Sequence, residues 1–170
     1  MKIPLPEKKD YKPAPEGLHQ GVCVDFVNMG KKMVTYKGEK PKEVRRCRYV
    51  FELEATFEDE EGKEARYIHS EFFNIPQWLS PNSGLRIFVT GWIGPKRFAE
   101  LAAKGFDTDW LVGEQIQLSI QHAPKPDGEG VWANATPIPA ADGQSVVPSG
   151  DYTPVKERDG YSEPDDDIPF

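Results

Sequence analysis

The run from Arg45 to Phe57 most constrains the fold, because apolar and charged side chains alternate along it. Its apolar members share one parity: Cys47, Tyr49, Phe51 and Leu53. The residues between them are charged, except that Val50 interrupts the charged face. A period of two places the two sets on opposite faces of a strand. The run therefore predicts a β-strand with one face in a hydrophobic core and the other carrying charge.

Four further runs predict strands, and they are Leu18–Asn28 with an extension over Met33–Tyr36, Ala65–Phe73, Gln115–Gln121 and Val131–Ile138. Between the third and fourth runs, Ser83 is a candidate helix N-cap. Behind it, Leu85, Phe88, Val89 and Trp92 recur at helical spacing. A second short helix is expected to start at Pro95.

This order of elements predicts an all-β domain with one or two short helices. Three strands, a helix and two strands form the sequence of a five-stranded OB-fold barrel with its helix between strands 3 and 4, although small α+β domains share it. We expect this domain over residues 17–139, after a flexible N-terminal arm over 1–16. Residues 140–164 are rich in Gly, Pro, Ser and acidic residues. Such a segment predicts a disordered linker.

Charge is unevenly distributed along the 170 residues. Eight acidic and two basic residues lie in 140–170, so this segment carries −6 of the net charge of −7. Lys31 to Arg48 instead contains eight basic and two acidic residues. This basic stretch is a candidate phosphate-binding surface. The acidic segment is expected to compete for it, so deletion of 140–170 should strengthen nucleic-acid binding at low salt.

An OB barrel holds single strands with a basic groove and aromatic platforms on which bases stack. Parity places Phe72 outside and Phe73 in the core, Tyr36 lies within the basic loop, and Trp78 is either core or stacker. The candidate DNA-binding residues are Lys31, Lys32, Tyr36, Lys37, Lys40, Lys42, Arg46, Arg48, Arg66, Phe72 and Trp78.

The residues 165–170 read as an acidic patch, a short apolar hook and a free carboxylate. Pro169 restricts the preceding residue to an extended backbone, which lowers the ordering cost of binding. Phe170 can fill a pocket while its carboxylate meets a cation. We therefore expect a partner-docking tip made of Asp165, Asp166, Asp167, Ile168, Pro169 and Phe170. The alternative is an acidic solubilising tail.

This tip resembles that of bacterial single-stranded DNA-binding proteins, whose chains end in the same Asp-Asp-Asp-Ile-Pro-Phe form. The body is more similar to the OB-fold DNA-binding proteins of tailed phages. The similar stretches are Ser83-Gly84-Leu85-Arg86, Trp92-Ile93-Gly94, Gly105-Phe106-Asp107 and Leu111-Val112-Gly113. Together the resemblances imply a phage protein that binds single-stranded DNA in replication, recombination and repair. They also imply recruitment of host replication and repair proteins through the tip.

Other functions are less well supported by the residues. His19, His69 and His122 have no zinc-ligand spacing, and no phosphate-cradling or nucleophile-elbow motif occurs, so we expect no enzyme, no metal and no cofactor. Metal-dependent nuclease activity around Glu58 is a weak rival. A stronger rival is an adaptor or decoy that presents the tip and binds DNA poorly. Cys23 and Cys47 predict buried thiols and the cytoplasm. No membrane partner is expected, whereas self-association stays open.

Overall fold

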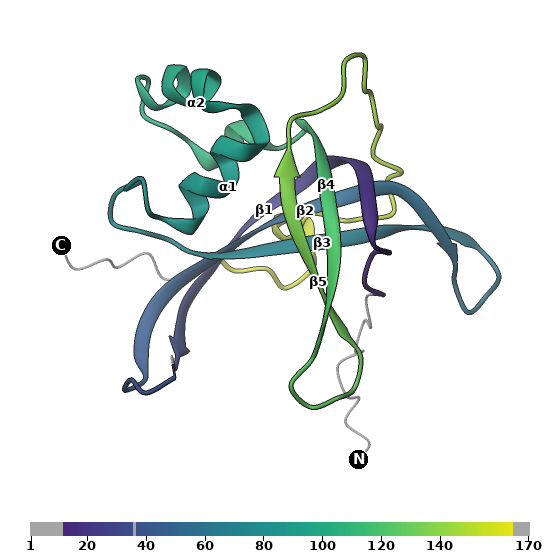
Figure 1. The fold of residues 1–170 in the computed structure, drawn as a ribbon, viewed down its shortest axis with the longest axis horizontal. Helices are drawn as coiled ribbons and strands as arrows, with labels where there is room; N and C mark the ends of the chain where they lie inside the picture. The colour runs from purple at the N-terminus through teal and green to yellow at the C-terminus, as the bar shows by residue number, and fades with distance from the viewer. Residues whose placement is uncertain (1–11, 36, 165–170) are drawn as a thin grey trace.

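The computed structural model describes residues 12–35 and 37–164, which form one five-stranded antiparallel sheet. The strands are β1 (Gly17–Val34), β2 (Lys42–Glu58), β3 (Glu64–Asn74), β4 (Gln115–Pro124) and β5 (Val131–Ile138). They lie side by side in the order β3-β2-β1-β4-β5 (Figure 1). Every predicted strand is present, and β1 and β2 are longer than expected because their ends pair with each other to Val34 and Lys42.

Two helices separate β3 from β4, as the sequence predicts. Helix α1 (Gly84–Ile93) begins after Ser83, whose hydroxyl accepts a hydrogen bond from the backbone N–H of Arg86 at 3.2 Å. Helix α2 (Pro95–Ala102) follows directly, with proline in its first turn where no N–H is needed. Two short 3-10 turns, η1 (Thr108–Leu111) and η2 (Val155–Glu157), complete the elements.

The core lies between α1 and one face of the sheet, which we call the inner face. The indole ring of Trp92 packs edge-on against Tyr49 and Phe51, with ring centroids 5.3 and 5.2 Å apart. Trp92 Nε1 donates to the carbonyl of Gln115, which satisfies its only polar atom at 2.8 Å. Cys23 and Cys47 are also buried there, as predicted. The alternation in β2 therefore assigns the inner face correctly.

The sheet is not closed into a barrel, which corrects the finer part of the predicted fold. Strand β5 pairs with β4 alone, and β3 pairs with β2 alone. Helix α1 packs against both β3 and β5 on the open side. Pro137 in β5 lies against Gly91 of α1 and has no N–H to donate to another strand. The helix therefore fills the place where a closing pair of strands would lie.

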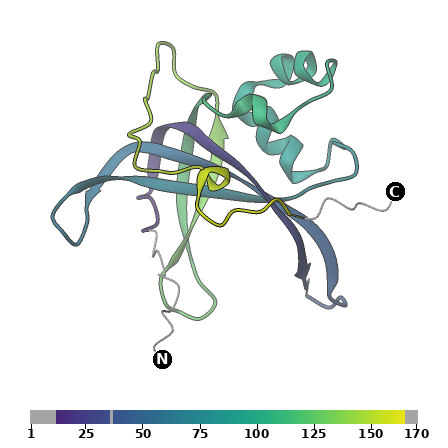
Figure 2. The ribbon, with the colours of Figure 1, turned by 180° about the vertical axis from the view of Figure 1, so that it is seen from behind.

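Residues 140–164 are ordered across the opposite, outer face of the sheet, and we call them the strap (Figure 2). The sequence predicted a disordered linker here, whereas the structure packs the segment against the sheet. Gln144 Nε2 donates to the carbonyls of Gly21 and Ile116 at 3.1 and 2.9 Å. The side chain of Gln115 accepts from Val146 N and donates to Val146 O. These side-chain bonds fix the strap to β1 and β4, and composition does not reveal them.

The predicted N-terminal arm is also partly packed. Ala14 is buried, and its carbonyl accepts a hydrogen bond from His122 Nε2 at 2.7 Å. The carboxylate of Glu16 accepts from the backbone N–H of His122 at 3.0 Å. Residues 12–16 therefore belong to the domain, while residues 1–11 lie outside the described part.

We predict that Gln144→Ala loosens the strap. The substitution leaves two backbone carbonyls without their side-chain donor, which should cost about 1–3 kcal/mol. Urea unfolding and amide hydrogen exchange at Val146 and Ser149 measure the effect. Ser145→Ala is the control, because Ser145 is exposed in the same turn. Equal exchange rates in the two variants would contradict the role of Gln144.

Candidate nucleic-acid interface

The distal part of the β1–β2 hairpin, residues 28–46, extends from the sheet as a two-stranded ribbon (Figure 1). We call it the basic arm. Strand β4 pairs with β1 only as far as Val22, and β3 pairs with β2 only as far as Arg46. The lysines predicted as DNA contacts are all exposed here, and they are Lys31, Lys32, Lys37, Lys40 and Lys42. Tyr36, in the same loop, lies outside the described residues.

The strand register divides the charges of the arm between two faces. Lys31 pairs with Arg45 and Met33 with Glu43, so these residues share the inner side. The Lys31 ammonium there lies 3.9 Å from the Glu43 carboxylate. On the outer side, Lys32 pairs with Val44, Lys42 with Val34 and Arg46 with Gly30. Directly opposite residues of an antiparallel pair lie on the same face.

Four cations therefore follow one face of the ribbon into the sheet, because Arg48 has the parity of Arg46. We call them the basic stripe: Lys32, Lys42, Arg46 and Arg48. The stripe ends beside an exposed aromatic ring. Arg48 pairs with Phe72 of β3, and Arg46 pairs with Asn74. A row of positive charge beside an exposed ring is the surface that holds a phosphate backbone and a stacked base.

Phe72 is 45% exposed, whereas Phe73 is buried, which confirms the parity prediction. The guanidinium of Arg46 lies 6.0 Å from the centroid of the Phe72 ring. Arg46 Nη1 also donates to Asn74 Oδ1 at 3.0 Å. These contacts hold the cation near the ring and leave nearly half of Phe72 accessible. Asn74 completes the site, and no sequence pattern predicted its role.

Arg48 lies where the strap begins to cover the stripe. Its Nε is buried and has no hydrogen-bond partner among the described residues. The neighbouring strap residue is Tyr152, whose hydroxyl donates to Asp25 Oδ2 at 2.9 Å. Burial, and then this hydrogen bond, raise the pKa of the Tyr152 phenol above its usual value, while the positive charge of Arg48 lowers it. Arg48 is therefore close to the strap and retains a free donor.

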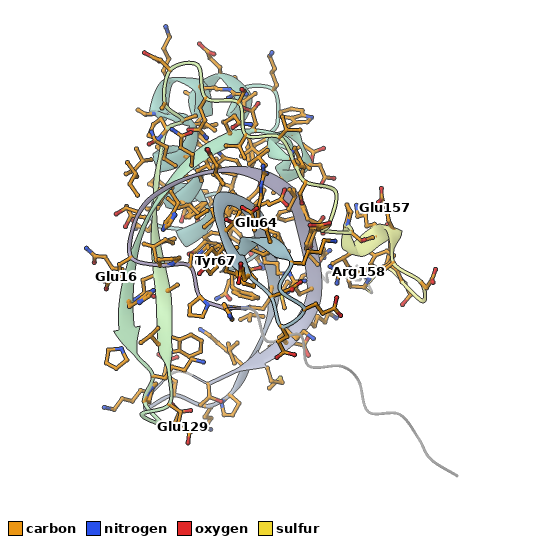
Figure 3. The ribbon with its side chains drawn as sticks, turned by 90° about the vertical axis from the view of Figure 1, so that its right-hand side faces the viewer. Glu16, Glu64, Tyr67, Glu129, Glu157 and Arg158 are labelled. Atoms are coloured by element: carbon orange, nitrogen blue, oxygen red, sulfur yellow. The ribbon has the colours of Figure 1, made fainter. Side chains whose placement is uncertain are left out.

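Two buried carboxylates fix the strap over the outer face. Glu52 is 1% exposed and accepts hydrogen bonds from the backbone N–H and the hydroxyl of Ser149. Asp25 accepts from Tyr152 and from the backbone N–H of Val155. Figure 3 shows Glu157 of η2 and the following Arg158 on this side of the molecule, away from Glu16. The predicted charged face of β2 is therefore open at Arg46 and covered at Glu52.

Arg66, one of the predicted DNA contacts, lies apart from the stripe. It pairs with Thr56, ten residues along β2 from Arg46, a separation of about 30 Å at the usual rise per residue. Its Nη1 donates to the Val147 carbonyl and lies 3.7 Å from Glu52. Arg66 thus neutralises a buried carboxylate and holds the strap.

Trp78 is exposed and is therefore not a core residue, while its stacking on a base stays a prediction. It is 69% accessible in the loop after β3. The loop starts beside the arm, because Ile75 N donates to the Arg45 carbonyl at 2.7 Å. Trp110 is 43% exposed near η1, and Trp132 of β5 is exposed with Lys125 over its ring. Trp78 is therefore the exposed tryptophan whose loop adjoins the arm.

The comparisons with known proteins add no family to this geometry. No protein-family model matches the chain, and no curated protein is significantly similar to it in sequence. Within the described residues, no group of His, Cys, Asp and Glu side chains is arranged to hold a metal ion. None of the described helices is long and apolar enough to cross a membrane. The residues 165–170 lie outside the described part.

Sequence reasoning missed the residues that fix the strap: Asp25, Glu52, Gln144 and Ser149. One signal was available in β2. Val50 is apolar on the charged face, and the structure buries it to 1% exposure under the strap. An apolar residue on an otherwise charged face of a strand indicates that another segment covers it there.

We predict that the contribution of Tyr152 to stability is lost at alkaline pH. The phenol is an acid with an ordinary pKa of 10.0, raised in the folded state. Above pH 10 the unfolded state loses its proton first, so the free energy of unfolding falls by up to about 1.4 kcal/mol per pH unit.

The Tyr152→Phe variant has no phenol to ionise. The difference between its free energy of unfolding and that of wild type therefore isolates the contribution of Tyr152. At pH 7 the variant should be less stable than wild type, because Asp25 loses a hydrogen-bond donor. The difference in free energy of unfolding between the two proteins should narrow between pH 10 and 11.5. Urea unfolding across that range measures it. A gap that stays constant or widens would contradict a raised pKa.

Proposed function

We propose that the chain binds single-stranded DNA, without sequence preference, along the basic stripe. The single observation that carries the proposal is the register that places four cations on one face beside the exposed ring of Phe72. The order of elements supports it, because β1-β2-β3, two helices, then β4-β5 is that of an OB fold opened between β3 and β5. The resemblances given above point to the same activity.

The mechanism follows from the chemistry of the stripe. Lys32, Lys42 and Arg46 contact successive phosphates, and the backbone of the DNA runs along the arm toward the sheet. One base stacks on Phe72, and a neighbouring base can reach Trp78. Since every base has a π-face, stacking tolerates any sequence. Because lysines and arginines displace counterions from DNA, affinity falls with salt.

We predict that Phe72→Ala weakens binding to oligo-dT by about 5- to 150-fold, which corresponds to the 1–3 kcal/mol of a stacked base. Fluorescence anisotropy of a labelled oligonucleotide measures the loss. Trp132→Ala is the control, because Trp132 is equally exposed on β5 outside the stripe. An effect of Trp132→Ala equal to that of Phe72→Ala would place the DNA elsewhere.

The charges are tested by the salt dependence of affinity. Lys32→Ala combined with Lys42→Ala should reduce the slope of log affinity against log salt by about 1.4, because each of the two phosphate contacts contributes about 0.7 for a single strand. Lys96→Ala, on α2, should leave the slope unchanged. A slope that the double substitution does not change would contradict the stripe.

The strap limits how far the DNA extends. Beyond Arg48 the outer face is occupied by the strap, which itself carries acidic residues such as Asp151 and Asp159. We propose that a longer DNA strand displaces Tyr152 from Arg48 and gains that guanidinium. Deletion of 140–170 would uncover the buried residues Val50 and Glu52, so point substitutions are the better probe.

The residues 165–170 provide the second half of the proposal. They recruit replication and repair proteins, so that the chain serves DNA replication, recombination and repair, in a host cytoplasm if it is phage-encoded. The rival function is an adaptor or decoy that presents these residues and binds DNA weakly. A chain that binds no oligonucleotide at low salt, yet binds host proteins through residues 165–170, would favour the rival.

A further inference from the structure

The two helices form an open apolar groove on the side away from the core. Its volume is about 760 Å³. Its lining includes the large apolar residues Leu79, Ile87, Phe98 and Phe106, and three small residues of α2 and its C-terminal end, Ala99, Ala102 and Ala103. Ile87 and the three alanines are exposed. The groove can therefore receive large apolar side chains without rearrangement of the core.

One cation lies in this groove. Arg86 is the sole charged residue that lines it in the described part of the chain. Its Nη1 donates to the Leu79 carbonyl at 2.8 Å, and its guanidinium lies 5.1 Å from the centroid of the Phe98 ring. These contacts hold the charge in place at the apolar surface. Lys104 is exposed between Ala103 and Phe106, beside the groove. An occupant should therefore combine large apolar side chains with negative charge.

The strap leads the chain toward this groove. Pro164, the last described residue, shares a small cavity with Asp109 of η1. Asp109 follows the groove residue Phe106 by three positions, a span of about 10 Å at most. The six residues after Pro164 span about 20 Å when extended. Residues 165–170 can therefore reach the groove of their own molecule.

We propose that residues 165–170 dock in the groove between α1 and α2 of the same chain. Phe170 and Ile168 enter the apolar part beside the three alanines, and the aspartates face Arg86 and Lys104. Pro169 keeps the segment extended, which lowers the ordering cost. The inference rests on the docking role proposed for residues 165–170 but not on DNA binding.

Docking within one molecule regulates when these residues are available. A tethered segment has an effective concentration in the millimolar range, so a weak contact is enough to occupy the groove. Partner proteins that bind Phe170 must then compete with it. The groove thus suppresses weak partners and leaves strong ones able to bind.

Nuclear magnetic resonance of the full chain tests the proposal without DNA. Phe170→Ala should shift the amide signals of Ala99, Ala102 and Ala103, and leave those of β4 unchanged. The shifts should be the same at 20 µM and 500 µM protein, since docking is intramolecular. Identical groove signals in wild type and variant would overturn the proposal. Shifts that disappear on dilution would overturn it too, because they would assign the groove to a second copy.

A peptide experiment supplies an independent readout. A labelled synthetic peptide of residues 162–170 should bind the Phe170→Ala chain about ten-fold more tightly than wild type, whose own segment competes. Ala102→Glu, combined with Phe170→Ala, should abolish peptide binding, while Gln121→Glu adds the same charge on the exposed side of β4 and should not. Equal peptide affinity for wild type and Phe170→Ala would overturn intramolecular docking.

Circular dichroism establishes that Ala102→Glu is folded, which Ala102 permits because it is exposed. The same variant should bind oligo-dT as wild type does, because α2 is outside the stripe. Phe72→Ala should lose DNA binding and keep normal peptide binding. DNA binding along the stripe and docking in the groove can therefore be tested independently of each other.

Discussion

Two buried carboxylates hold the strap against the outer face of the sheet. Glu52 and Asp25 are almost removed from solvent, and a buried charge is tolerated only when hydrogen bonds and opposite charge compensate it. The strap supplies the hydrogen-bond donors, from Ser149, Tyr152 and Val155, and Arg66 supplies positive charge. Because these contacts fix the strap across β1 and β2, they also decide which part of the outer face a ligand can use.

What the strap leaves open is the end of the sheet from which the basic arm extends. There β1 and β2 pair only with each other, and their register gathers Lys32, Lys42 and Arg46 on one side. Phe72 is exposed at the junction because β3 ends two residues later, at Asn74. Arg48 is at the boundary between the open and the covered parts. Local strand pairing thus provides the charge and the platform together.

Much of the fold was predictable from local patterns. Alternation in β2 identified its inner face, the parity of Phe72 and Phe73 was correct, and Ser83 was recognised as an N-cap because its side chain acts within one turn. That the sheet stays open was not predictable from local patterns, because it depends on the packing of α1 between β3 and β5. Local alternation does not report which strands meet at the edges of a sheet.

The strap shows where composition fails. Residues 140–164 are polar and rich in glycine and proline, which is typical of disorder. Their order comes from bonds between residues far apart in sequence, such as Ser149 with Glu52 and Gln144 with Gly21. The same long-range contacts hold Arg66 beside Val147 and Glu52, apart from the stripe. Only Val50, apolar on a charged face, indicated that this face is covered.

Photo-crosslinking to a single-stranded oligonucleotide that carries 4-thiothymidine, followed by mass spectrometry of the peptides, locates the bound DNA on the protein. We expect cross-links at Phe72 and within the basic arm, and none on β5. Cross-links confined to the β4–β5 hairpin, or to the helices, would show that the DNA binds elsewhere and would contradict the stripe as the binding surface.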